Sequence, residues 1–123
     1  MINLASVFLG GGLGACLRYL TGKFVAKFSI NPCVSTFIVN ILGSFLIGFI
    51  FSYSIHKFPL NNHLKLFLTT GLMGGLTTFS TFTFEGLSFI KSGDYFSFIL
   101  YTLSSFLISL LMAFLGFELA KAI

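Results

Sequence analysis

Residues 71–85 read GLMGGLTTFSTFTFE and lie in the middle of a long apolar run. The first five of these residues include three glycines, and threonines and serines follow them closely. Three glycines near the middle of a membrane-spanning run predict a broken helix, whose freed backbone groups must find partners inside the protein. The alternative is an intact helix with a glycine-rich packing surface. The neighbouring threonines favour the break, because buried polar groups in a membrane mark functional positions.

The rest of the chain has the composition of a membrane protein. Hydrophobic residues make up 56% of the 123 residues and charged residues only 8%, whereas soluble domains carry roughly 25% charged residues. A spanning helix needs about 20 apolar residues. We therefore predict an all-α membrane protein with a single domain over residues 1–123 and a third helix broken near its middle. Its four transmembrane helices are expected at about residues 2–20, 33–55, 64–90 and 95–119.

The positive charges are divided almost evenly between the two predicted faces of the membrane. The chain has seven Lys and Arg residues and three Asp and Glu residues. Most of these charges occur singly between apolar runs, which is typical of residues that anchor helix ends at the lipid headgroups. One face would carry Lys57, Lys65 and Lys121, and the other Arg18, Lys23, Lys27 and Lys91. Because an excess of Lys and Arg sets orientation, this balance predicts insertion both ways round. Two opposite orientations can pair as an antiparallel homodimer with a two-fold axis.

Phe79 and Phe82 are candidate anion-contacting residues. They are three residues apart and share a helix face, and the edge of a phenyl ring carries a partial positive charge. Most of the 18 phenylalanines are expected to face lipid or core. This pair differs because the hydroxyls of Ser80 and Thr81 stand beside it and can replace lost water.

Further polar residues lie within or at the ends of the other runs. The amide of Asn40 can donate to an anion or make an ordinary interhelical hydrogen bond. Tyr101, Ser105 and Ser109 form a stripe on the last run, since they are four residues apart. Their hydroxyls can line a path or bond to their own helix.

Two ionisable residues also have two interpretations each. Glu85 is the only acid well inside a run, where it can relay protons, shape the electric field or act as a capping or hydrogen-bonding residue near a wet vestibule. Arg18 can draw anions into a vestibule or extend to the lipid headgroups.

Small residues recur at a spacing of four, at Gly10 and Gly14 and at Ser44 and Gly48. This spacing lets helix backbones approach closely in lipid, either inside one subunit or between subunits. Cys16 and Cys33 are interpreted as small apolar residues. No catalytic set or phosphate-binding loop is present, so we do not expect an enzyme.

Three stretches resemble one known family, the small bacterial fluoride channels of the Fluc/CrcB family. They are GGLGACLRY at residues 11–19, VNILGSF at residues 39–45 and GLMGGLTTFSTF at residues 71–82. The last is the most specific, and the resemblance covers nearly the whole chain. It implies a fluoride-selective channel in the cell inner membrane that exports fluoride passively and so reduces its toxicity.

The resemblance also implies a dual-topology homodimer with two pores and a role for each candidate residue. A sodium ion at the dimer centre would be held by backbone carbonyls of Gly74 and Thr77. Arg18 would be the vestibule arginine and Glu85 the acid beside the pore. Lining the fluoride path would be Phe79, Phe82, Asn40, Ser80, Thr81, Tyr101, Ser105 and Ser109. The preference for fluoride over chloride follows from the resemblance alone.

Two other functions remain open from the residues themselves. A proton-coupled drug exporter needs a buried acid, for which Glu85 is the only candidate. A structural subunit without transport would leave the polar segment of residues 77–85 unexplained.

Overall fold

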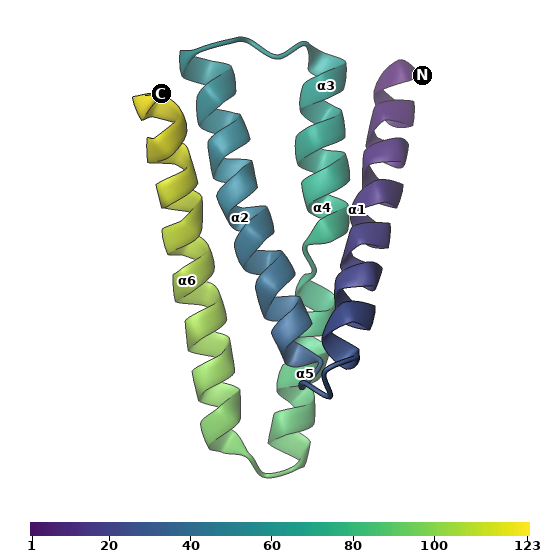
Figure 1. The fold of residues 1–123 in the computed structure, drawn as a ribbon, viewed down its shortest axis with the longest axis vertical. Coiled ribbons are helices and arrows are strands. Elements are labelled where there is room, and N and C mark those ends of the chain that lie inside the picture. Colours follow the sequence, from purple (N-terminus) through teal and green to yellow (C-terminus); the bar gives the residue numbers. More distant parts are fainter.

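The computed structural model describes all 123 residues, and every regular element in it is a helix (Figure 1). In chain order the elements are α1 (Ile2–Ala26), α2 (Cys33–His56), α3 (Asn62–Leu66), the π-helical segment η1 (Phe67–Met73), α4 (Gly74–Leu76), α5 (Phe79–Lys91) and α6 (Tyr95–Ala122). The helices form four rods joined by short turns: α1, α2, a third rod made of α3, η1, α4 and α5, and α6.

The third rod is broken, as the sequence predicted. The segments α3, η1 and α4 follow one another without interruption, and α5 begins after two extended residues. Thr77 has φ −78° and ψ 156°, and Thr78 has φ −149° and ψ 125°. The break therefore lies just after the glycines rather than on them, since Gly74 keeps helical angles of φ −63° and ψ −36°.

The glycines serve close backbone packing instead. An added Cβ on Gly10 would overlap the carbonyl oxygen of Phe67, and one on Gly14 would overlap that of Leu72. On the facing rod, a Cβ on Gly75 would overlap the carbonyl oxygen of Gly11. Small residues thus let α1 and the first half of the third rod touch backbone to backbone. The spacing of Gly10 and Gly14 serves a contact inside one subunit.

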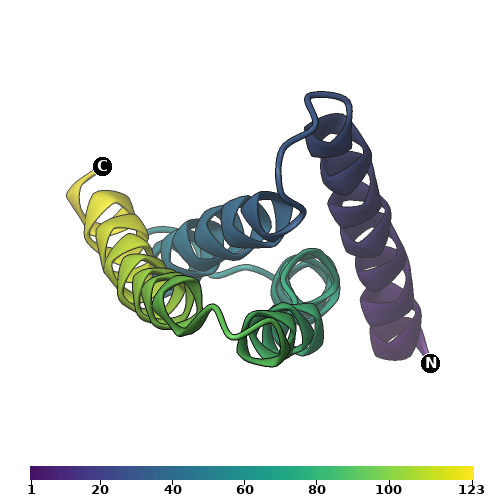
Figure 2. The ribbon, with the colours of Figure 1, turned by 90° about the horizontal axis from the view of Figure 1, so that it is seen from below.

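The same device joins the other two rods. A Cβ on Gly48 in α2 would overlap the carbonyl oxygen of Ala113, and one on Gly116 in α6 would overlap that of Phe45. Helices α2 and α6 pack together, while α1 packs on η1 and α4. Seen from below, α1 and α6 lie on opposite sides with α2 and the third rod between them (Figure 2).

Both termini and the α2–α3 loop lie at one end of the bundle, and the α1–α2 and α5–α6 turns lie at the other (Figure 1). This is the arrangement on which the count of charges by face depends. At the second end, Asp94 caps α6 by accepting a hydrogen bond of 3.0 Å from the Ser97 N–H. Hydrogen bonding from Ser97, from its side chain first and from its N–H second, lowers the pKa of the Asp94 carboxyl group.

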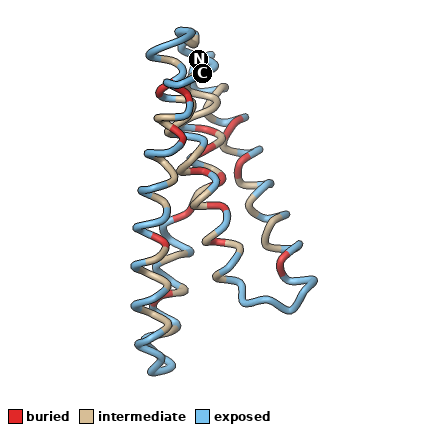
Figure 3. Tube along the Cα trace, turned by 60° about the vertical axis from the view of Figure 1, so that its left-hand side comes forward, coloured by how far each residue is buried: buried red, intermediate tan, exposed pale blue.

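Most apolar side chains point outward. Only 15 of 123 residues are buried (Figure 3), and large exposed apolar residues occur along every long helix. Three helices, α1, α2 and α6, are long and apolar enough to cross a membrane. The remaining predicted span, residues 64–90, consists of the two segments on either side of the break. This apolar exterior suits a multi-pass membrane protein, because lipid rather than water can cover it.

Candidate functional site

Two side chains from other helices bind the backbone at the break. Asn40 on α2 bonds Thr78 twice: its Oδ1 accepts from the Thr78 N–H at 2.8 Å, and its Nδ2 donates to the Thr78 carbonyl at 3.1 Å. Arg18 on α1 donates from Nη1 to the Thr77 carbonyl at 3.0 Å. Backbone groups freed by a break in a membrane helix need such partners. The extended conformation is therefore held from both sides.

The Thr78 side chain starts the helix that follows. Its Oγ1 accepts a hydrogen bond from the Thr81 N–H at 3.2 Å, which is an N-cap of α5. The same hydroxyl donates to Thr81 Oγ1 at 3.1 Å and lies 3.4 Å from Ser80 Oγ. The predicted path residues Ser80 and Thr81 thus cluster at the first turn of α5, where both are exposed.

A groove of about 500 Å³ lies at the break and is lined by residues of α2, of the third rod on both sides of the break and of α6. None of the 16 residues that line it is charged. Seven of them belong to the predicted site: Asn40, Gly74, Thr77, Phe79, Phe82, Ser105 and Ser109. The groove therefore combines apolar walls with hydroxyl, amide and backbone groups, as ligand sites commonly do.

Ser105 differs from the other polar residues of the groove. Its side chain is 6% exposed, and its Oγ has no hydrogen-bond partner. It is the only buried side-chain polar atom in the structure left without one. A buried hydroxyl without a partner costs free energy. A partner from outside the chain would remove that cost.

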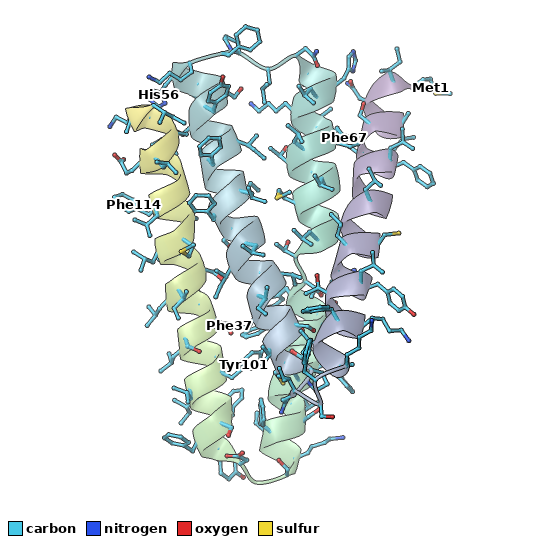
Figure 4. The ribbon with its side chains drawn as sticks, viewed as in Figure 1. Met1, Phe37, His56, Phe67, Tyr101 and Phe114 are labelled. Carbon is cyan, nitrogen blue, oxygen red and sulfur yellow. The ribbon has the colours of Figure 1, made fainter.

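The aromatic rings form a short row at the groove. The ring centroids of Phe79 and Phe82 are 5.8 Å apart, and those of Phe82 and Tyr101 are 5.2 Å apart. Phe79 is 76% exposed. Tyr101 projects from α6 toward α5 (Figure 4) and does not itself line this groove. The row thus runs from an exposed ring at the break to a tyrosine anchored deeper in the bundle.

Glu85 lies outside the groove and is fixed by two hydroxyls. Thr36 on α2 donates to Oε1 at 2.8 Å, and the hydroxyl of Tyr101 donates to Oε2 at 2.6 Å. The carboxylate joins α2, α5 and α6 at this level. Arg18 also lies outside the groove, although its guanidinium reaches the backbone carbonyl of a groove residue, Thr77.

The sequence analysis did not single out Thr36 or the capping role of Thr78. Thr36 is 4% exposed and lies four residues before Asn40, so the two side chains share one face of α2. That spacing was the available signal for Thr36. For Thr78 the available signal was that threonine is a favoured N-cap residue and stands directly before a helix.

Comparison with known proteins now identifies the family. Residues 5–117 match the family model described as CrcB-like protein, Camphor Resistance (CrcB). The chain belongs to the CrcB family.

Curated relatives of this CrcB-family chain have one functional name. A protein of Aquifex aeolicus named fluoride-specific ion channel FluC is 41% identical over 96% of both chains. A Staphylococcus saprophyticus protein named fluoride-specific ion channel FluC 2 is 43% identical over 95% of both chains. A FluC of Clostridium perfringens is 54% identical over 72% of this chain and 70% of its own length. These are names of channels, in agreement with the prediction that the chain is not an enzyme.

Proposed function

We propose that this protein is a fluoride channel, through which fluoride leaves the cell down its electrochemical gradient. The observation that carries the proposal is the unpartnered, buried Ser105 Oγ in an uncharged groove that Phe82 also lines. The names of the relatives point to the same ion.

The chemistry of the groove suits a small, strongly hydrated anion. Such an ion crosses a narrow path only where several donors replace its water at close range. The hydroxyls of Ser105 and Ser109 can donate, and so can the second Nδ2 hydrogen of Asn40. The ring edges of Phe79 and Phe82 add partial positive charge without a formal charge that would hold the anion too tightly.

The working unit that we propose is an antiparallel homodimer. One subunit leaves the exposed Phe79 ring and the groove at its surface. A second copy in the opposite orientation would cover this face and generate two equivalent paths. The near-even division of Lys and Arg between the two ends supports insertion in both orientations. The expected location is the cell inner membrane.

A sodium ion at the dimer centre is part of the same proposal. The candidate ligands are the carbonyl oxygens of Gly74 and Thr77, and oxygen atoms are the ligands that hard cations take. The Thr78 N–H would close a helical bond on the Gly74 carbonyl, but it donates to Asn40 instead. Gly74 is exposed in the single subunit, so its backbone is accessible to an ion. Sodium would supply a fixed positive charge between the subunits.

The deciding experiment is ion release from liposomes that contain the purified protein. Fluoride release is followed with a fluoride electrode, and chloride release from matched liposomes is the control. Fast fluoride release without chloride release is expected. If inserted, dimeric protein releases neither ion, the channel proposal is wrong.

A further inference from the structure

The break replaces two helical hydrogen bonds with bonds from side chains. In an unbroken helix the Thr78 N–H would donate to the Gly74 carbonyl, and the Thr81 N–H to the Thr77 carbonyl. Here the Thr78 N–H donates to Asn40 Oδ1 and the Thr81 N–H to Thr78 Oγ1. Asn40 Nδ2 then takes the Thr78 carbonyl. A single amide side chain thus satisfies both backbone groups of one extended residue.

The Thr77 carbonyl receives its hydrogen bond from Arg18. The guanidinium is partly buried, and no carboxylate neutralises it, because the only ion pair in the chain joins Lys121 to Glu118. Arginine stays charged under all ordinary conditions. The uncompensated positive charge of Arg18 therefore contacts the Thr77 carbonyl oxygen, one of the two oxygens at which the cation is proposed to bind.

We propose that Asn40 and Arg18 act as a positioning clamp on the break, and that the charge of Arg18 limits how tightly the break binds a monovalent cation. The inference rests on the proposed function, since the cation site belongs to it. Asn40 keeps the Gly74 carbonyl free of its helical donor. Arg18 fixes the Thr77 carbonyl but repels a cation that shares the same oxygen. Asn40 and Arg18 thus fix the geometry of the cation site, while the charge of Arg18 lowers its affinity for the cation.

The charge effect is tested by sodium-dependent stability, without fluoride. The thermal unfolding midpoint of the purified protein is measured in detergent against sodium chloride, with N-methylglucamine chloride keeping the ionic strength constant. Arg18→Gln removes the charge and retains an N–H donor, although on a shorter side chain. It is expected to lower the sodium concentration that gives half-maximal stabilisation, called the sodium midpoint below, on the order of tenfold.

Two control variants separate charge at the break from charge in general. Lys23→Gln removes a positive charge from the same helix, where the ammonium lies over the Tyr19 ring instead of the break. We expect its sodium midpoint to stay within about twofold of wild type, because an exposed charge is screened. Arg18→Lys, which keeps the charge, is also expected to stay near wild type. If Arg18→Gln shifts the midpoint no further than Lys23→Gln, the charge effect is refuted.

The role of Asn40 is tested by backbone hydrogen exchange in residues 77–81. Asn40→Ala leaves both backbone groups of Thr78 unpaired, so we expect exchange to become at least about tenfold faster and the sodium midpoint to rise. Ser44→Ala, one turn further along α2 and on the same groove, is expected to change neither. Asn40→Asp keeps the acceptor for the Thr78 N–H and should fall between Asn40→Ala and wild type. Wild-type exchange in both Asn40 variants would overturn the clamp.

These measurements fail independently of the channel proposal. A wild-type protein that releases no fluoride, but whose sodium midpoint shifts in Arg18→Gln, would refute the channel and support the charge effect. Fluoride release by a protein whose stability does not depend on sodium would refute the charge effect and leave the channel proposal in place.

Discussion

The two halves of the third rod differ in how they meet the rest of the molecule. Before the break, η1 and α4 lie against α1 with glycine facing backbone, and no room remains for a Cβ at Gly71 or Gly75. After the break, α5 buries only Gly86, and Phe79 at its start is 76% exposed. The first half, called the packed half below, is held by close backbone contact with α1 inside the subunit. The second half, α5, is called the aromatic half below, and its polar and aromatic side chains are free to contact an ion or a second copy.

The largest effect is expected from a methyl group added to the packed half. Gly14→Ala places a Cβ against the carbonyl oxygen of Leu72, so backbones must separate. We expect a loss of at least about 3 kcal/mol, the upper range for overpacking, seen as loss of monodisperse protein in size-exclusion chromatography. Gly12→Ala is the matched control on the same helix, since its Cβ meets nothing within 4 Å. Equal behaviour of the two variants would show that α1 does not pack here as described.

The aromatic half should respond in the opposite way, with lost transport and retained folding. Phe82→Ile removes a ring that contacts both Phe79 and Tyr101. Aromatic pairs are worth up to about 1.5 kcal/mol, and a loss of this size at the barrier to transport would lower fluoride release roughly tenfold. Phe79→Ile should fall similarly, and both variants should elute like wild type. A well-folded variant with unchanged release would remove that ring from the mechanism.

How far the sequence could predict this contrast depends on the physical origin of each feature. Three long helices and a broken third rod followed from apolar length and clustered glycines, which are local properties. The position of the break did not, because the glycines near Gly71 stay helical where they pack on α1. The backbone groups of Thr77 and Thr78 at the break bond to Arg18 and Asn40, which lie far from them along the chain. Such long-range pairings leave no periodic signal.

The candidate site shows the same division. Seven predicted residues came together in one groove because their helices place them there. Glu85 was recognised as the only acid within a span, but the sequence left open whether it moves protons or makes hydrogen bonds. Its two hydroxyl donors come from α2 and α6, and only the fold reveals them. The roles of these residues in conduction stay predictions.

Glu85 allows a smaller effect on the same half to be measured. Glu85→Gln keeps one acceptor but replaces hydrogen bonds to a charged group with neutral ones, each weaker by about 1 kcal/mol. If the protein is a channel, its fluoride release should then fall by less than about tenfold. Glu118→Gln, at the far end of α6, is the control and should have no effect. A proton-coupled exporter would lose its transport completely. Complete loss in well-folded Glu85→Gln would therefore favour the exporter.

The smallest effect is expected at the junction of the two halves, where Arg18 meets the break. If its charge also draws anions toward the path, Arg18→Gln should reduce fluoride release about two- to fivefold at low ionic strength. The reduction should shrink at high ionic strength, because charges are screened over about 10 Å at 0.1 M salt. Sodium is kept constant above its midpoint so that the cation site stays filled, and chloride release is measured alongside. A reduction that is independent of ionic strength would show that Arg18 acts only by holding the Thr77 carbonyl. Its role would then be structural, like that of the glycines that pack η1 and α4 on α1.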